Sequence, residues 1–326
     1  MKRINRTGYW MAEPVLVFKG TAIARYGFGD PHPFGLDRHD VFHEELAAEN
    51  LRGGVRFGIT RDATVDELWL FHTADYSDLV SRKTGEGRGV LDQGDTPAWP
   101  GIFDAASSVV GTTLAAVDAV MNSQARRAFT PIAGLHHAGR GHAAGFCVFN
   151  DCGVAAEYLR SRYGLRRIAY VDIDAHHGDG MFYGFEDDPD LIFADIHEDG
   201  RYLYPGTGAA AETGKGPAAG TKLNIPLAPG AGDEEFSAAW ERVRGYLEAA
   251  KPEFILLQCG ADSLAGDPIT HLSFTENAHA RAAASLCEIA DRYASGRIVA
   301  TGGGGYNRRN LARAWTRVVR AFAESP

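Results

Sequence analysis

The chain has 326 residues, of which 45% are hydrophobic and 23% charged, and its formal net charge is -9. This length can bury a large core, and the composition is that of an ordinary globular protein. The negative charge excludes a basic footprint for nucleic acid, and no continuous apolar run approaches the roughly 18 residues of a membrane span. The four cysteines form no CxxC pair. We therefore expect a soluble cytoplasmic protein with reduced thiols and with no nucleic-acid or membrane partner.

The first third of the chain alternates irregular segments with short elements. Residues 1–14 predict an irregular N-terminal arm, and a short apolar strand follows at Val15–Phe18. One long loop rich in glycine and proline comes next, and a second is expected at 85–100. Helices are predicted at about 37–50, shortly after 65–72, and at 103–120. No repeat or linker divides the sequence, so one domain over 15–326 is the simplest organisation.

The rest of the chain alternates apolar and amphipathic segments, which is the pattern of a parallel sheet covered by helices on both faces. The apolar segments predict strands at 133–135, 168–173, 191–196, 254–259 and 297–301. The amphipathic segments predict helices at about 150–162, 233–250, 275–294 and 307–323. In such α/β sheets ligands bind beyond the carboxyl ends of the strands, so residues that follow different strands can converge.

The stretch 169–180 is the richest in candidate metal ligands. Asp174 and His176 are two residues apart at a strand end, so both side chains fall on one side and can share a cation. Asp172 points the same way and can support them from behind. Asp262 follows a later strand and adds a carboxylate. Three protein ligands leave a position open for water, which indicates a catalytic metal site, although the stretch taken alone is equally compatible with a capped strand–helix junction.

Two other strand ends carry groups suited to hydrolysis. His136 and His137 follow the strand at 133–135 and can take a proton from water and deliver it to a leaving amine. Asp172 and Asp179 are candidate acceptors for their rings. Tyr306 follows four glycines and is placed to donate a hydrogen bond to a developing oxyanion. Each feature alone has an ordinary structural explanation, but their coincidence at four strand ends predicts metal-assisted hydrolysis.

These motifs resemble the histone deacetylase family of the arginase/deacetylase superfamily. The similar segments follow the family's order at 94–97, 101–104, 135–138, 145–151, 171–180, 204–208, 260–268 and 302–307. The four glycines before Tyr306 are most similar to class I members and to the bacterial acetoin-utilisation type. The resemblance implies a single α/β domain of the arginase/deacetylase fold over 15–326, with an eight-stranded parallel sheet flanked by helices on both faces.

The resemblance also implies roles for the site residues. One Zn²⁺ or Fe²⁺ ion is implied, and its ligands match Asp174, His176 and Asp262. The catalytic residues that match are His136, His137, their carboxylate partners Asp172 and Asp179, and Tyr306, which polarises the acetyl carbonyl. A structural K⁺ or Na⁺ ion is implied beneath them, and the matching positions are Asp172, Asp174, His176, Asp195 and Ile196. The family usually has Ser or Thr at position 195.

The resemblance further implies a substrate path. Phe146 and Tyr204, with Gly145 beside them, match the walls of a narrow acyl-lysine tunnel, although Phe is more common at position 204. Asp95 matches a rim carboxylate that binds the backbone amides of a peptide, and Ile269 lies at the same rim. Arg38 matches an arginine of the channel that releases acetate.

We therefore expect a zinc-dependent amidohydrolase that removes acetyl from the ε-amine of lysine in a protein or peptide. An acetylpolyamine amidohydrolase is the nearest alternative, but its members often have a Glu where Ile269 stands, and Asp95 favours a peptide. An arginase-like enzyme needs a second metal, and Gly178 and Leu264 replace carboxylates that this metal requires. A catalytically inactive binding relative is expected to have lost a site residue, and none is lost. The sequence is compatible with a homo-oligomer.

Overall fold

The computed structural model describes residues 14–51 and 54–325, so the predicted arm lies outside the described residues except for Pro14. Its centre is one sheet of eight strands, all parallel, in the order β2-β1-β3-β8-β7-β4-β5-β6. The strands are β1 Val15–Phe18, β2 Val55–Gly58, β3 Arg127–Thr130, β4 Ile168–Asp172, β5 Leu191–Glu198, β6 Lys222–Leu227, β7 Phe254–Gln258 and β8 Ile298–Thr301. The predicted parallel sheet is confirmed.

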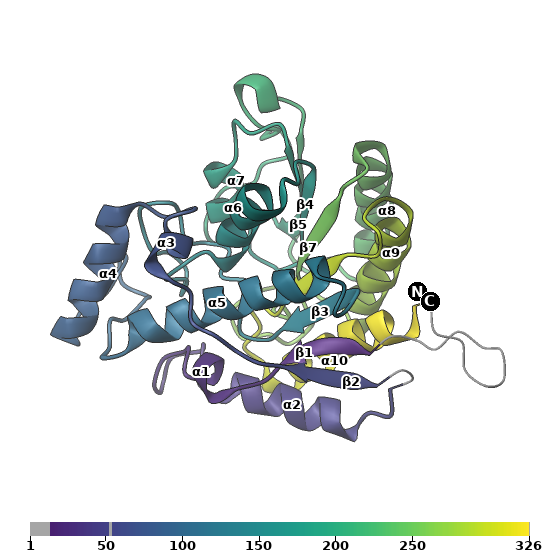
Figure 1. Cartoon of the computed structure of the whole chain (residues 1–326). Helices are drawn as coiled ribbons and strands as arrows, with labels where there is room; N and C mark the ends of the chain where they lie inside the picture. The colour runs from purple at the N-terminus through teal and green to yellow at the C-terminus, as the bar shows by residue number, and fades with distance from the viewer. Residues whose placement is uncertain (1–13, 52–53, 326) are drawn as a thin grey trace.

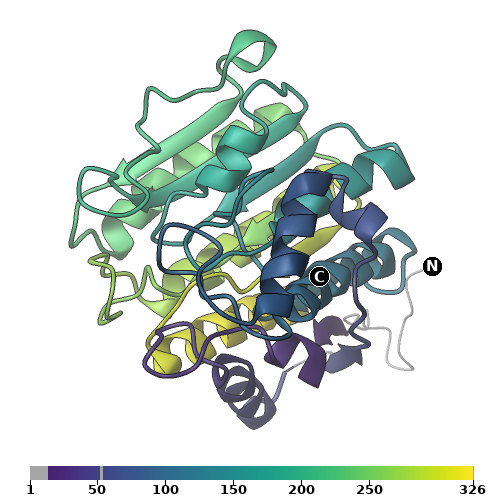
Figure 2. The ribbon, with the colours of Figure 1, turned by 90° about the vertical axis from the view of Figure 1, so that its left-hand side faces the viewer.

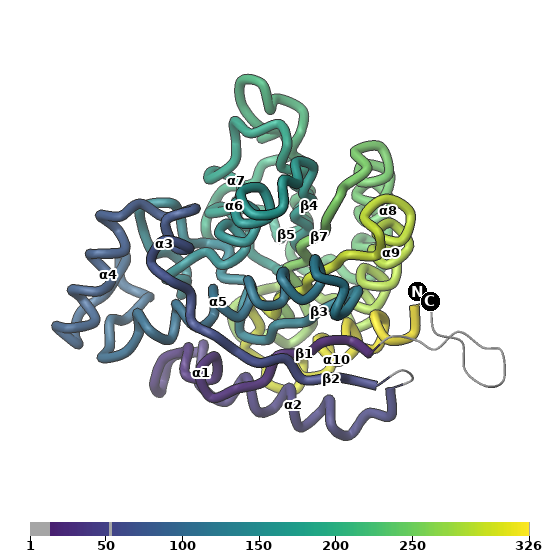
Figure 3. Tube along the Cα trace, viewed as in Figure 1, coloured from purple at the N-terminus to yellow at the C-terminus, as the bar shows by residue number. Residues whose placement is uncertain are grey.

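Helices cover both faces of the sheet (Figures 1 and 2). They are α1 Thr21–Ala24, α2 Arg38–Ala48, α3 Val65–Leu68, α4 Ala74–Glu86, α5 Ile102–Met121, α6 Asp151–Tyr163, α7 Asp179–Gly184, α8 Asp233–Ala250, α9 Glu276–Tyr293 and α10 Arg308–Glu324, with a 3₁₀ turn at Gly216–Ala218. On one side α5 packs against α6, and on the other α10 packs against α2 and α9. Figure 3 shows α2 and α10, which are far apart in sequence, running side by side.

The central strands begin with continuous apolar runs because helices bury both of their faces, and polar residues appear toward their carboxyl ends. Every residue of β4, β5 and β7 is buried. The helix α5 is long and apolar enough to cross a membrane, but 78% of its most apolar window is buried inside the protein. It is therefore a core helix, apolar on all sides because the sheet and α6 surround it.

The sequence-based boundaries were wrong at three strands. The strand predicted at 133–135 is a loop, and β3 lies earlier, at Arg127–Thr130. Pro131 follows the strand, and Ile132 and Gly134 then have positive φ values of 67° and 93°, which turn the chain. The strands β2 and β6 were not predicted because they form the two sheet edges and carry polar or exposed residues, where the apolar pattern is weak.

The helix α3 was not predicted, whereas α4 was. A short helix was expected after 65–72, and α4 lies there at Ala74–Glu86, while α3 lies within 65–72 at Val65–Leu68. A Thr caps each of them: the side chain of Thr64 accepts from Glu67 N–H and that of Thr73 from Tyr76 N–H. These caps set the helix starts.

Candidate active site

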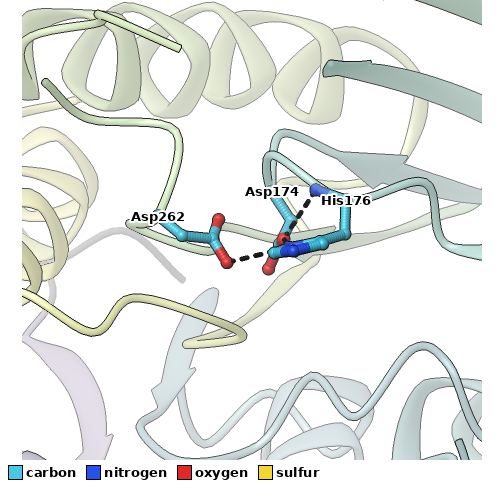
Figure 4. Close-up of side chains that lie close together, drawn as sticks. All are labelled: Asp174, His176 and Asp262. Atoms are coloured by element: carbon cyan, nitrogen blue, oxygen red, sulfur yellow. Dashed lines mark hydrogen bonds and ion pairs between the residues drawn. The ribbon is translucent and has the colours of Figure 1, made fainter. Parts of the chain in front are cut away.

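The candidate ligands converge at the carboxyl ends of β4 and β7, in the middle of the sheet. Asp174 and His176 come from the loop after β4 and face Asp262 from the loop after β7 (Figure 4). His176 Nδ1 lies 3.1 Å from Asp174 Oδ1 and 3.2 Å from Asp262 Oδ2. Among the described residues these three are the one group whose ligand atoms all lie within 4.8 Å of one another.

The charges of this trio fit a divalent cation. All three side chains are buried. Burial and the neighbouring Asp174 raise the pKa of Asp262 to about 7, which reflects the cost of holding two carboxylates together away from water. A cation between them would remove that cost, and one imidazole with two carboxylates is a donor set that Zn²⁺ and Fe²⁺ accept.

Backbone and amide donors aim the carboxylates. Asp174 Oδ2 accepts hydrogen bonds from Gly304 N–H and Gln258 Nε2–H, both at 2.9 Å. Ala175 N–H donates to Asp262 Oδ1, also at 2.9 Å. The glycine is required here, because a Cβ on Gly304 would lie 2.0 Å from Asp262 Oδ2. The backbone of the glycine run is thus part of the wall of the site.

The two histidines form one hydrogen-bonded chain with two carboxylates. His136 Nδ1 pairs with Asp172 Oδ2 at 2.8 Å, and His137 Nδ1 pairs with Asp179 Oδ1 at 2.6 Å. The two Nε2 atoms are 3.1 Å apart. One of the two rings must therefore donate to the other.

The pKa shifts of the two rings differ in sign. Burial lowers the pKa of His136, but the Asp172 and Asp174 carboxylates outweigh it and raise this pKa to about 9. Burial and the charge of His136 lower the pKa of His137 to about 4. His136 therefore carries the extra proton and donates to His137, whose Nε2 is left as an acceptor.

Tyr306 is held by its backbone at the end of the glycine run. Its N–H donates to Asp267 Oδ2 at 2.8 Å. Burial and the Asp262 charge raise its pKa well above the usual value, so the phenol keeps its proton. Arg38 lies buried behind it and donates through Nε to Gly305 O at 3.0 Å and through Nη2 to Gly303 O at 2.6 Å. Its Nη1 has no hydrogen-bond partner among the described residues.

The residues predicted to wall a tunnel lie against the catalytic candidates. The ring of Phe146 is 5.8 Å from that of Tyr306, and the ring of Tyr204 is 5.1 Å from that of His137. A Cβ on Gly145 would lie 2.4 Å from the ring of His137. A small cavity lies at the catalytic candidates, and its lining includes Phe34, His137, Gly145, Asp174, His176 and Tyr306 but neither Phe146 nor Tyr204.

The two predicted rim residues lie in different loops. Asp95 is exposed, and its loop reaches the tunnel wall through Thr96, whose Oγ1 accepts from Phe146 N–H at 3.1 Å. Ile269 is half-buried, and its N–H donates to Asp267 Oδ1 at 3.1 Å. The Asp267 carboxylate thereby ties Ile269 to the backbone of Tyr306.

The Asp195 side chain, at one of the positions predicted to bind a monovalent cation, is engaged with two protein partners. Asp195 Oδ2 accepts from Gly178 N–H at 2.9 Å, and its Oδ1 pairs with His197 Nδ1 at 2.7 Å. His197 Nε2 faces Gly208 O at 2.9 Å, so both ring nitrogens face oxygen acceptors and the ring is positively charged. Burial lowers the pKa of His197, but Asp195 outweighs it. Ile196 lies buried in β5.

Two buried residues of the site were not predicted. Gln258 ends β7 and holds Asp174, as described above, and Tyr170 donates its hydroxyl to Asp172 Oδ2. A polar residue that ends an apolar strand, and a tyrosine inside one, both need buried partners. That need was the available signal, but the sequence alone does not say which groups become the partners.

The sequence and the fold both match known proteins. The histone deacetylase domain family matches residues 32–322. The chain belongs to the histone deacetylase family. Within the family it is similar to the acetoin utilization protein AcuC of Bacillus subtilis (strain 168), with 40% identity over 303 residues that cover 90% of this chain and 78% of the relative.

Further comparisons agree. The acetoin utilization protein AcuC of Staphylococcus aureus (strain MRSA252) is 32% identical over 338 residues, covering 100% of this chain and 84% of the relative. The crystal structure of the HDA15 HD domain has a TM-score of 0.89 and 26% identity, and covers 96% of this chain and 89% of that one. The predicted family and its α/β fold are therefore confirmed, and the chain belongs to a family of deacetylases, which are hydrolases.

Proposed function

We propose that this histone deacetylase family member removes the acetyl group from the ε-amine of lysine in a protein or peptide, with one Zn²⁺ or Fe²⁺ ion held by Asp174, His176 and Asp262. The observation that carries the proposal is the junction of this buried trio with a histidine pair whose two pKa values are shifted in opposite directions. A trio alone suits many metal proteins, whereas the pair adds an acceptor and a fixed charge for amide hydrolysis.

When bound, the ion supplies Lewis-acid polarisation of the acyl carbonyl and lowers the pKa of water. The protein supplies the proton transfers. His137 Nε2, the acceptor of the pair, exchanges its hydrogen bond from His136 for one from the attacking water and takes the water proton, while Asp179 holds its other ring nitrogen at 2.6 Å. His137 then delivers that proton to the departing lysine amine, while the charged His136 stabilises the negative transition state.

Tyr306 donates its phenolic hydrogen to the oxygen that becomes negative during the attack. Its raised pKa favours this role, because the group stays protonated at neutral pH. Phe146 and Tyr204 would hold the extended lysine chain between them, and Asp95 would accept hydrogen bonds from the substrate backbone. Arg38, with its free Nη1, would attract the acetate product.

The proposal is tested by hydrolysis of an acetyl-lysine peptide by metal-stripped and metal-reconstituted protein. We expect activity only in the reconstituted sample, and we expect His137→Phe to abolish it while binding the metal like the wild type. Full activity in the stripped sample, or in His137→Phe, would contradict the assignment.

A further inference from the structure

The loop 92–96 is built as a rigid hairpin turn. Asp92 Oδ1 accepts hydrogen bonds from three successive backbone N–H groups, those of Gly94 at 3.0 Å, Asp95 at 3.1 Å and Thr96 at 3.0 Å. Val90 and Pro97 pair across the base of the turn. Asp95 is an exposed residue on a backbone that Asp92 has already ordered, and its Oδ1 lies 3.4 Å from Thr96 Oγ1.

Thr96 connects this loop to the tunnel wall. Its side chain is fully buried. The hydroxyl donates its one hydrogen to Asp92 Oδ2 and accepts the N–H of Phe146 at 3.1 Å. Because a hydroxyl offers one donor and two acceptor sites, both bonds form at once. A single side chain thus joins the rim loop to Phe146.

Phe146 needs such support because its backbone is strained. Its φ is 68°, in the left-handed region that residues with a side chain seldom adopt. The Tyr26 hydroxyl donates to Phe146 O at 2.6 Å, and Thr96 holds the N–H, so both polar groups of this residue are fixed. Strain of this kind persists only where the surroundings enforce it.

His32 makes a second link between the same two parts. Its Nδ1 accepts Phe34 N–H at 3.1 Å, which leaves Nε2 as the donor to Asp95 O at 3.0 Å. Its ring lies 4.5 Å from the ring of Phe146. The loop 92–96 and Phe146 are therefore linked twice, once through the side chain of Thr96 and once through that of His32.

We propose that Thr96 is a positioning residue that fixes the Asp95 loop relative to Phe146 and so sets the affinity for acyl-lysine carried on a peptide backbone. The inference rests on the proposed function. A peptide contacts the rim and the tunnel together. Because the spacing between Asp95 and Phe146 is already fixed, no binding energy is used to order the loop. A short acylated amine contacts the tunnel alone and gains nothing from that spacing.

The test compares Thr96→Val, which keeps the shape and loses the hydroxyl, with Thr96→Ser, which keeps the hydroxyl. For an acetyl-lysine peptide we expect Thr96→Val to raise KM about tenfold, with kcat within about twofold of the wild type. For N-butylacetamide, which has no peptide backbone, we expect kcat/KM to change less than about twofold. Thr96→Ser should restore the wild-type KM.

An equal loss on both substrates, or a fall in kcat alone, would overturn the proposal. His32→Phe keeps the ring against Phe146 but loses the hydrogen bond to Asp95 O, and we expect it to show the same rise in KM for the peptide, so the inference does not depend on one variant's folding. Hydrogen exchange at the Phe146 amide separates this inference from the proposed function. Thr96→Val should speed that exchange at least about tenfold. Unchanged exchange would overturn the proposed link between Thr96 and Phe146, whatever the activity of the protein. A wild-type protein with no activity on the peptide would contradict only the proposed function.

Discussion

At the scale of single residues, the site holds several ionisable groups close enough to shift one another's pKa values. Two buried carboxylates lie beside one imidazole, and burial with the Asp174 charge raises the pKa of Asp262 to about 7. Nearby, His136 is charged and His137 is neutral because one pKa is raised to about 9 and the other lowered to about 4. Such separation of pKa values within one pair is what distinguishes an acceptor from an electrostatic partner.

The phenol of Tyr306 gives a prediction at this scale. We expect Tyr306→Phe to lower kcat by about 10²- to 10³-fold, because the donor to the developing oxyanion is lost. Metal content, measured by atomic absorption, should stay at the wild-type level since Tyr306 is not one of the three ligands. Wild-type turnover in this variant would show that the oxyanion assignment is wrong.

Gly304 gives a second prediction at the scale of single residues. A Cβ at this position would lie 2.0 Å from Asp262 Oδ2 and 2.9 Å from Asp174 Oδ2, so Gly304→Ala must displace a ligand. We expect metal affinity, measured by competition with a chelator, to fall about 10- to 100-fold. Gly245→Ala is the matched control, because a Cβ there meets no atom within 4 Å. A Gly304→Ala protein with wild-type affinity would contradict the geometry.

At the scale of elements, the strand ends bring the site together. The strands β3, β8, β7 and β4 are consecutive in the sheet, and the loops that follow them carry the histidine pair, Tyr306, Asp262 and the Asp174 segment. These loops could be predicted from apolar runs followed by chemically active residues. The partners Gln258 and Thr96 could not, because their hydrogen bonds join segments that only the folded chain brings together.

A buried histidine beside the start of α6 predicts that acid lowers the stability of the fold. His72 Nε2 accepts the N–H of Asn150, the residue that caps α6, at 2.9 Å. Burial lowers the pKa of His72 from 6.5 to about 3. The unfolded chain therefore binds this proton more readily, so the stabilisation is complete above pH 6.5 and is lost as the pH falls toward 3.

Urea unfolding at pH 7.5, 6 and 5 measures this contribution. One such histidine changes the free energy of unfolding by up to about 1.4 kcal/mol per pH unit between those pKa values. His72→Gln keeps an acceptor for Asn150 N–H and does not titrate, so we expect a shallower loss of stability with acid in that variant. Identical slopes in the two proteins would refute the assignment.

The charged pair on β5 leads to a salt prediction. Asp195 and His197 supply their own buried cation beneath the site. We therefore expect peptide deacetylation to differ less than about twofold between KCl and tetramethylammonium chloride at equal ionic strength, where general screening is the same. Activity that requires K⁺ would show that the monovalent ion is bound despite this pair.

At the scale of the whole molecule, the class of fold was easier to predict than the two edge strands of the sheet. The buried strands β4, β5, β7 and β8 coincide with apolar runs in the sequence, because helices cover both of their faces. The edge strands β2 and β6 have mixed composition, since one edge faces solvent, and local patterns do not identify them. The number of strands came from the family resemblance and not from periodicity.

One sheet with one candidate metal-binding group among the described residues predicts how the protein unfolds. We expect one cooperative thermal transition whose midpoint temperature rises with Zn²⁺. The ion should add about 2.7 kcal/mol to the free energy of unfolding when its free concentration is 100 times its Kd. Asp262→Asn should unfold cooperatively and show no such shift, as followed by calorimetry. An equal shift in this variant would place the ion elsewhere.

The central claim is that the substrate is acetyl-lysine on a peptide. Its most direct test is the ratio of kcat/KM for an acetyl-lysine peptide to kcat/KM for acetylspermidine and acetylputrescine, measured on metal-loaded protein with a metal-stripped control. We predict that the loaded protein prefers the peptide by about tenfold or more, because only the peptide can use the rim as well as the tunnel. A preference for either polyamine, or no metal-dependent hydrolysis of any of the three, would contradict it.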